Sequence, residues 1–173
     1  NEKAASLYKK MGYKVVDTVE FLNVNKTMKL KAPEHMSLQL TIKQVALQKI
    51  KQLGFYKAMY PWQTQIDSAE FASGIIAQDA VGKELGYAYY QKRFDDEGNL
   101  LSVLLYQCET APQLNHPEEV IKCMLGEVLK DFHEKINCTI PNLPVNQSET
   151  TYQVLKELGF QTVAKQYYML KEI

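Results

Sequence analysis

Apolar residues recur at helical spacing near the start of the chain and stop at a glycine. In residues 2–11 they are Ala4, Leu7, Tyr8 and Met11, which predicts a helix with one apolar face. Gly12 suits the left-handed conformation that ends many helices. Residues 14–22, KVVDTVEFL, are rich in β-branched and apolar side chains and predict a strand.

The same helix–glycine–strand unit recurs near the other end, at an offset of 147 residues that aligns Asn1 with Ser148. The matched pairs include Glu2 with Glu149, Lys9 with Lys156, Gly12 with Gly159, Tyr13 with Phe160 and Val16 with Val163. One interpretation is that any helix–glycine–strand unit shows this likeness. The other is that the chain holds parts of two domains in tandem, because the offset is far longer than the period of a solenoid repeat, about 20–50 residues. We expect residues 1–31 to be the terminal helix and strand of a first domain and residues 32–173 to be a second domain.

The chain between the two units predicts the body of the second domain. After a linker around Pro33, residues 40–60 predict a helix, and residues 61–71 are irregular. The apolar face of that helix would be Ile42, Val45, Ala46, Ile50 and Leu53. Further strands are predicted in residues 72–79, 85–94, 100–109, 138–145 and 162–170, and further helices in residues 115–135 and 148–158. The turn-rich connectors after the first two of these strands indicate antiparallel hairpins.

Composition narrows the class of protein. The 173 residues carry 20 basic and 20 acidic side chains and no basic stripe, so we expect no nucleic-acid partner. No apolar run reaches the roughly 18–20 residues that span a bilayer, so we expect no membrane partner. The three cysteines form no CxxC pair, which predicts neither a disulfide framework nor a metal site. A cytoplasmic location is therefore expected.

The first unit resembles the terminal motif N-x-x-A-x-x-L-Y-x-x-x-G-[FY] of the GNAT superfamily of acyl-CoA-dependent N-acyltransferases. It matches through Asn1, Ala4, Leu7, Tyr8, Gly12 and Tyr13, and the second unit matches more loosely through Leu158, Gly159 and Phe160. The resemblance covers nearly the whole chain, which would be the C-terminal part of a tandem protein. It implies an α/β (α+β) fold, with a mixed, mostly antiparallel sheet flanked by helices.

The resemblance also implies functional residues. Asn1 would contact the pantetheine arm of acetyl-CoA, and Tyr8 would protonate the departing CoA thiolate as a general acid; alternatively, Tyr8 simply packs against its own helix. In the second unit Ser148 replaces the Asn and Leu155 replaces the Tyr. Asn146 and Tyr152 are the nearby substitutes for cofactor contact and for proton donation.

The phosphate-binding loop of the family, Q/R-x-x-G-x-G/A, would fall on residues 107–112, QCETAP. Only Gln107 remains as a cofactor-binding candidate, since both glycines are missing and Pro112 has no N–H. Glu109, Glu118 and Glu119 would also repel a pyrophosphate. We therefore expect the second domain not to bind CoA in the usual way.

Other polar and aromatic candidates carry weaker signals. His116 precedes Pro117 and is either a helix cap or a base, while the sequence by itself does not indicate which residues would act together with His35 or His133. Glu70 and Glu84 are possible bases for an acceptor amine. Tyr87 and Tyr89 should share one face of their strand and Tyr90 the other, where they either pack or line an acceptor cleft.

Two functions remain open. In the first, the parent protein transfers an acetyl group from acetyl-CoA to an amine acceptor of unknown identity, by direct attack on the thioester. In the second, the complete domain is a non-catalytic GNAT-like module that binds a partner or dimerises. We expect residues 14–22 to pair with the sheet of the second domain or with a neighbouring chain, as in a strand-exchanged homodimer, because a bare apolar strand invites pairing.

Overall fold

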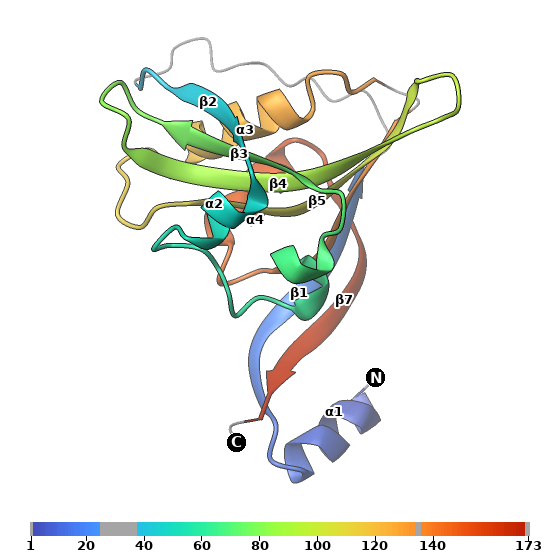
Figure 1. Ribbon diagram of the computed structural model, residues 1–173. Helices are drawn as coiled ribbons and strands as arrows, with labels where there is room; N and C mark the ends of the chain where they lie inside the picture. Colours follow the sequence, from blue (N-terminus) through green and yellow to red (C-terminus); the bar gives the residue numbers. More distant parts are fainter. Residues whose placement is uncertain (1, 25–37, 134–135, 172–173) are drawn as a thin grey trace.

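Seven strands form one mixed sheet in the order β2-β3-β4-β5-β6-β1-β7 (Figure 1). The computed structural model describes residues 2–24, 38–133 and 136–171. The strands are β1 (Lys14–Val24), β2 (Thr41–Val45), β3 (Ser73–Gln78), β4 (Glu84–Phe94), β5 (Leu100–Thr110), β6 (Asn137–Pro144) and β7 (Gln161–Leu170). The helices are α1 (Glu2–Lys10), α2 (Leu47–Lys51), α3 (Pro117–Val128) and α4 (Glu149–Glu157), with short 3-10 turns η1 (Trp62–Thr64) and η2 (Ile66–Ser68).

The pairing of the strands confirms the predicted fold class. Among the described strands, β5 and β6 are the only parallel neighbours, and all other neighbours are antiparallel. The β3–β4 and β4–β5 hairpins lie where the turn-rich connectors predicted them. Gly12 and Gly159 end their helices with φ of 88° and 95°, the left-handed values expected at these stops. No helix within these described segments is long and apolar enough to cross a membrane.

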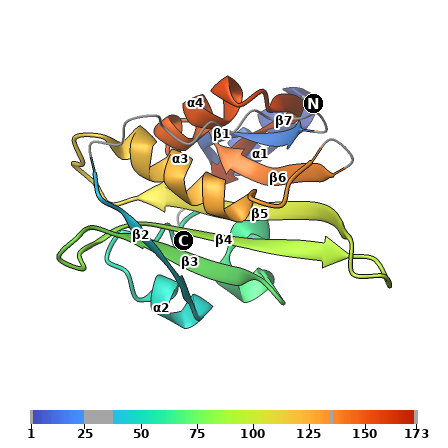
Figure 2. The same ribbon diagram turned by 90° about the horizontal axis from the view of Figure 1, so that it is seen from above.

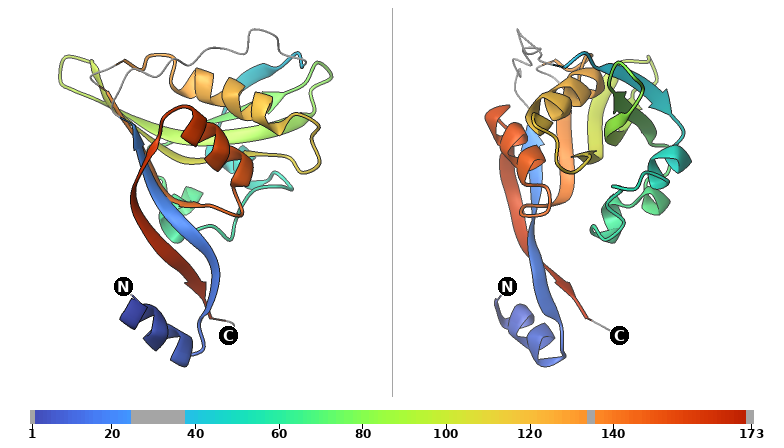
Figure 3. Two further views of the ribbon diagram at one scale, coloured as in Figure 1. Left: turned by 180° about the vertical axis from the view of Figure 1, so that it is seen from behind. Right: turned by 90° about the vertical axis from the view of Figure 1, so that its left-hand side faces the viewer.

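Strand β1 lies inside the sheet, between β6 and β7, and pairs antiparallel with both. This confirms the expectation that residues 14–22 join the sheet of the downstream strands. In the described part of the sheet β7 pairs with β1 alone, so β1 attaches it to the remaining strands. Figures 1 and 3 show β1 and β7 leaving the sheet as a long ribbon, with α1 at its far end.

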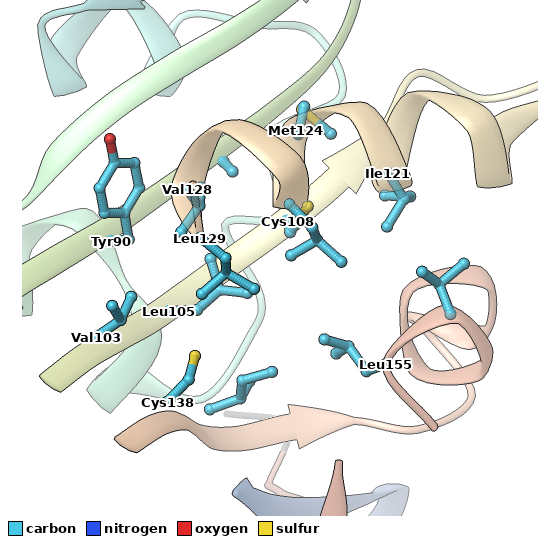
Figure 4. Packing of buried hydrophobic residues seen from close by; sticks show 14 of the residues in the cluster. Tyr90, Val103, Leu105, Cys108, Ile121, Met124, Val128, Leu129, Cys138 and Leu155 are labelled. Carbon is cyan, nitrogen blue, oxygen red and sulfur yellow. The ribbon is translucent and has the colours of Figure 1, made fainter. Parts of the chain in front are cut away.

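The two faces of the sheet are covered by different elements (Figure 2). Helices α3 and α4 cover one face, over a buried cluster that includes Leu105, Met124 and Leu155 (Figure 4). The opposite face carries α2 and the turns η1 and η2, over a second cluster. Tyr87 and Tyr89 belong to this second cluster and Tyr90 to the first, as the alternation along the strand predicted.

The helix predicted over residues 40–60 is wrong for most of its length. Residues 41–45 form β2, and only Leu47–Lys51 are helical. Ile42 packs on the α3 face of the sheet and Val45 on the α2 face, whereas one helix would have placed both on one side. The β-branched residues of this stretch fit a strand, and pairing with β3 outweighs the helical spacing.

The close approach of α3 to β4 requires a glycine at position 86. A Cβ atom on Gly86 would lie 2.9 Å from Val120 Cγ1, 2.9 Å from Met124 Cε and 3.0 Å from the Glu109 carbonyl oxygen. The backbone oxygen cannot swing away as a flexible side chain would. Hence α3 can pack this closely only over a residue without a side chain.

Gly86→Ala is expected to lower the free energy of unfolding by about 1–3 kcal/mol, the usual cost of overpacking. Urea unfolding followed by circular dichroism measures this change. The matched control is Gly54→Ala, where nothing lies within 4 Å of the added Cβ, so its effect should stay within about 0.5 kcal/mol. Equal stability of the two variants would contradict the packing argument.

Candidate functional site

The central feature of the sheet is the gap that opens between β5 and β6. The two strands pair in parallel only from Ser102 opposite Asn137 to Leu104 opposite Thr139, and β6 then continues along β1. At the same level β5 has a bulge at Tyr106, since Leu105 and Gln107 stand opposite consecutive residues of β4. A bulge bends its strand and increases its twist, so it helps β5 to turn away from β6.

A cavity of about 260 Å³ lies at the mouth of this gap. It is lined by the end of β5, the turn that follows, the start of α3, and residues 146–151 at the start of α4. Lys57 reaches it from the loop after α2. The cavity therefore occupies the place where two diverging strands and two helix starts meet.

A buried chain of hydrogen bonds spans the gap. Ser148, directly before α4, donates from Oγ to Oε1 of Glu109 at 2.5 Å. Tyr60 comes from the opposite face of the sheet, with its Oη 2.6 Å from Ser148 Oγ and 3.1 Å from the Gln147 carbonyl oxygen, to which it donates. Glu109, Ser148 and Tyr60 are all at least 95% buried. These three side chains join β5, α4 and the loop before η1 across the gap.

Burial raises the pKa of the Glu109 carboxyl to about 7, from a usual value near 4.5. The hydrogen bond from Ser148 and the charge of Lys57 act in the opposite direction but do not offset the loss of water. Glu109 is thus a buried carboxyl that exchanges its proton near neutral pH. A group of this kind can serve either as an acid–base residue or as a neutral hydrogen-bonding partner.

Strand β1 fixes the position of Ser148 through the buried Asp17. The carboxylate accepts hydrogen bonds from the Asn146 backbone N–H at 3.1 Å, from Asn146 Nδ2 at 2.9 Å and from the Gln147 N–H at 3.0 Å. These contacts hold the turn between β6 and α4. The side chain of Asn146, a predicted cofactor contact, therefore lies against Asp17.

Gln107, the other predicted contact in the second domain, lies within β5 rather than in a loop. It is 1% exposed; its Oε1 accepts from Tyr87 Oη at 2.8 Å, and its Nε2 donates to the Thr64 carbonyl oxygen at 3.1 Å. Tyr87 in turn accepts from the Lys57 N–H at 3.0 Å. Gln107 thus fastens the η1 segment onto the sheet.

The loop predicted over residues 107–112 is shorter than expected, because β5 continues to Thr110. The Ala111 N–H donates to the Leu85 carbonyl oxygen at 2.8 Å, and Pro112 has no N–H. His116 occupies the N-cap position of α3 without a side-chain cap hydrogen bond, and Pro117 is the first helical residue.

The two predicted proton donors lie apart from this cavity. Tyr152 on α4 donates from Oη to Glu20 of β1 at 3.1 Å. Tyr8 on α1 is 47% exposed, has its ring 5.6 Å from that of Tyr13, and lies at the far end of the β1–β7 ribbon (Figure 3). Asn1 and His35 lie outside the described residues.

The remaining candidate bases also lie away from the cavity. Glu84 forms an ion pair with Lys49 at 3.1 Å, and this contact holds the pKa of the Glu84 carboxyl below its usual value. Glu70 is exposed in the turn before β3. The described residues contain no group of three His, Cys, Asp or Glu side chains that could hold a metal ion.

Sequence reasoning missed the partnership of Glu109 with Ser148 and Tyr60. In the sequence, Glu109 stands out only as a negative charge near a phosphate site, and Ser148 only as the replacement of an Asn. The three residues are 39 to 88 positions apart in the chain, and no spacing pattern connects them. The one available signal is an acidic residue near the end of a strand that is otherwise uncharged.

No protein-family model and no curated protein matches this sequence. Solved structures with the same fold include a conserved protein of unknown function from Staphylococcus epidermidis, with a TM-score of 0.58 and 12% identity over 99% of this chain and 68% of that one. They also include GCN5-related N-acetyltransferases from Sphaerobacter thermophilus (TM-score 0.55, 10% identity, 95% of this chain and 54% of that one) and Kribbella flavida (0.50, 12%, 95% and 62%). The chain thus has the GCN5-related N-acetyltransferase fold and spans about half to two thirds of the length of these structures.

The raised pKa of Glu109 makes stability depend on pH. Between pH 4.5 and 7 the folded protein retains a proton that the unfolded chain releases, so the free energy of unfolding falls as pH rises through this range. Glu109→Gln keeps an oxygen that accepts from Ser148 and has no proton to lose. Above pH 7 it should therefore be more stable than the wild type, by on the order of 3 kcal/mol, and the two should converge near pH 4.5.

Urea unfolding at several pH values measures this difference. Glu84→Gln serves as the control with the opposite sign, because its carboxyl has a lowered pKa and adds stability only while ionised. Parallel stability curves for the wild type and Glu109→Gln between pH 4 and 8 would show that Glu109 carries no buried proton.

Proposed function

We propose that this chain is part of an acyl-CoA-dependent N-acyltransferase in which the domain from β2 to β7 does not itself transfer the acyl group. That domain is a binding module, and the chemistry belongs to the unit that contains α1. The observation that carries the proposal is the buried hydrogen bond between Ser148 and Glu109, which bridges the gap between β5 and the start of α4.

The bridged gap is the place where an acyl donor would have to enter. The resemblance described above puts the pantetheine arm beside the residue before this last helix, which here is Ser148. Opening the gap would separate Glu109, Ser148 and Tyr60 and leave buried polar groups without partners, at about 1–3 kcal/mol for each group. The binding of acetyl-CoA would have to supply that energy.

The helix start beyond the gap is also a poor phosphate site. The Ala111 N–H is already donated to Leu85, and two prolines remove further donors. Glu118 and Glu119 occupy the first turn of α3, where a pyrophosphate would have to approach. Two negative groups at the positive end of the helix compete with an anion for the same donors.

The unit that contains α1 has a tyrosine at the position where α4 has Leu155. This residue, Tyr8, is 47% exposed. In the proposed reaction a neutral amine attacks the thioester carbonyl, a backbone N–H stabilises the oxyanion, and the C–S bond breaks. The thiolate then takes a proton from Tyr8, and the proton lost by the amine passes to a base of the same unit.

The second candidate function is acyl transfer by the domain from β2 to β7 itself, and the raised pKa of Glu109 favours it. A buried carboxyl with a pKa of about 7, facing a cavity, can take a proton from an ammonium group near neutral pH. Lys57 lines the same cavity, where its positive charge would attract an anionic acyl donor. This function requires Ser148 and Tyr60 to move aside when the donor binds.

Calorimetric titration of acetyl-CoA distinguishes the two candidates. The 173-residue chain should give no saturable heat at millimolar acetyl-CoA, which places any binding free energy weaker than about −4 kcal/mol. The polypeptide extended upstream as its gene encodes it should bind. Saturable binding by the 173-residue chain, together with amine acetylation that is lost in Glu109→Gln, would overturn the proposal in favour of the second candidate.

Tyr8→Phe tests the role of the phenol in the extended polypeptide. Removing a proton donor should lower kcat by about 100-fold or more and leave KM for acetyl-CoA nearly unchanged. Tyr13→Phe is the matched control, because the Tyr13 ring contacts that of Tyr8 and the substitution removes the same hydroxyl group. Equal kcat values for the two variants would exclude Tyr8 as the acid.

A further inference from the structure

The register of the β1–β7 ribbon is symmetric with respect to the sequence repeat. The repeat offset of 147 residues makes Val19 and Gln166 equivalent, and these two residues stand directly opposite each other in the ribbon. Thr18 pairs with Tyr167, and Glu20 pairs with Lys165. Because the offset makes Thr18 equivalent to Lys165 and Glu20 equivalent to Tyr167, these two pairs are equivalent to each other. A local two-fold axis therefore passes between Val19 and Gln166 and exchanges the unit α1–β1 with the unit α4–β7.

The two halves of this symmetric ribbon have different surroundings. Along β1, Glu20 is 3% exposed and Leu22 is fully buried, because β6 pairs with this strand and α4 covers it. Their equivalents on β7 are Tyr167, which is 57% exposed, and Met169, which is half-buried. Among the described residues, the outer edge of β7 thus has no strand beside it, whereas the equivalent edge of β1 pairs with β6.

The two helices show the same contrast. Val154 and Leu155 of α4 are 2% and 0% exposed against α3 and the sheet. Their equivalents on α1, Leu7 and Tyr8, are 57% and 47% exposed. A cavity of about 670 Å³ lies between α1 and β7, lined by residues of both elements. Tyr8 of α1 and residues of β7 thus border the same cavity, and Figure 1 shows α1 at the far end of the β1–β7 ribbon.

We infer that this space is the docking site for a β6-like strand of a second half-sheet of the same fold. The strand pairs with Gln166–Leu170, as β6 pairs with β1, and α1 covers it, as α4 covers the sheet. It leads directly into α1, just as β6 ends at Pro144, five residues before α4 begins at Glu149. One sheet then runs through both domains. The inference rests on the two-domain arrangement proposed above, but not on its chemistry.

A second copy of this chain fits the site less well. Its own β6 already pairs with β5 and β1, so it cannot supply the strand. The copy could offer only an outer edge, β2 or β7, and neither leads into a helix that continues as α1. Pairing of two β7 edges would leave Leu7 and Tyr8 of both copies without the cover that α4 has. The register symmetry therefore favours a strand that precedes α1.

Charge substitutions on α1 test the inference in two proteins, the 173-residue chain and the polypeptide extended upstream as its gene encodes it. Leu7→Lys should leave the Tm of the 173-residue chain within about 2 °C, because Leu7 is exposed there. In the extended polypeptide it should lower Tm by about 5 °C or more, because the charge becomes buried. Lys10→Glu is the matched control, since its equivalent is the exposed Glu157, and it should change neither Tm.

Hydrogen exchange supplies a direct measure of the strand pairing. Those backbone amides of Gln166–Leu170 that point away from β1 should exchange at least tenfold more slowly in the extended polypeptide than in the 173-residue chain, while those that pair β1 with its neighbours should be protected in both. Protection in the 173-residue chain that rises with protein concentration would overturn the inference in favour of a second copy. Equal exchange in both proteins, or a gene that encodes no strand directly before α1, would also overturn it. Acetyl-CoA binding with no Tm effect of Leu7→Lys would leave the proposed function standing and reject this inference alone.

Discussion

The insertion of β1 between β6 and β7 is the contact on which the rest of the molecule depends. Backbone pairing on both edges of β1 joins β7 to the other strands. Two buried carboxylates of β1 also hold neighbouring elements in place. Asp17 binds the turn before α4, and Glu20 accepts hydrogen bonds from Tyr152 of α4 and Thr162 of β7. A segment at one end of the chain thus positions the helix at the other end, because side chains from adjacent strands meet where the sequence brings no residues together.

The β5–β6 gap is bridged by hydrogen bonds because β1 positions α4. Once Asp17 fixes the turn at Asn146 and Gln147, Ser148 is held opposite the end of β5. The carboxyl of Glu109 loses water there and gains a hydrogen bond, and the loss of water is the larger effect on its pKa. With a pKa of about 7, the buried carboxyl is neutral at lower pH and becomes charged as pH rises through 7. Below pH 7 the same group therefore closes the gap without the cost of a buried charge.

The fold supports several functions, so the site must decide between them. GCN5-related acetyltransferases share this sheet, but a shared sheet does not establish a shared reaction. In this chain the gap between the diverging strands holds a closed hydrogen-bond network, whereas Tyr8, the predicted proton donor, is partly exposed on α1. In the alignment at the offset of 147 residues, Tyr8 of α1 falls opposite Leu155 of α4, so the two helices carry different side chains at this position.

Local sequence patterns predicted the structure correctly where the conformation depends only on residues close by in the chain. Gly12 and Gly159 end helices because a left-handed backbone needs no partner elsewhere in the chain, and the alternation from Tyr87 to Tyr90 assigns side chains to two faces by strand geometry alone. The repeat of 147 residues was also visible in the sequence. Tertiary structure decided the remainder. Residues 41–45 became a strand because β3 offered backbone partners, and Glu109, Ser148 and Tyr60 became one network because β1 holds α4 against β5. Such contacts join residues far apart in the chain, and their energy depends on burial, which no local pattern records.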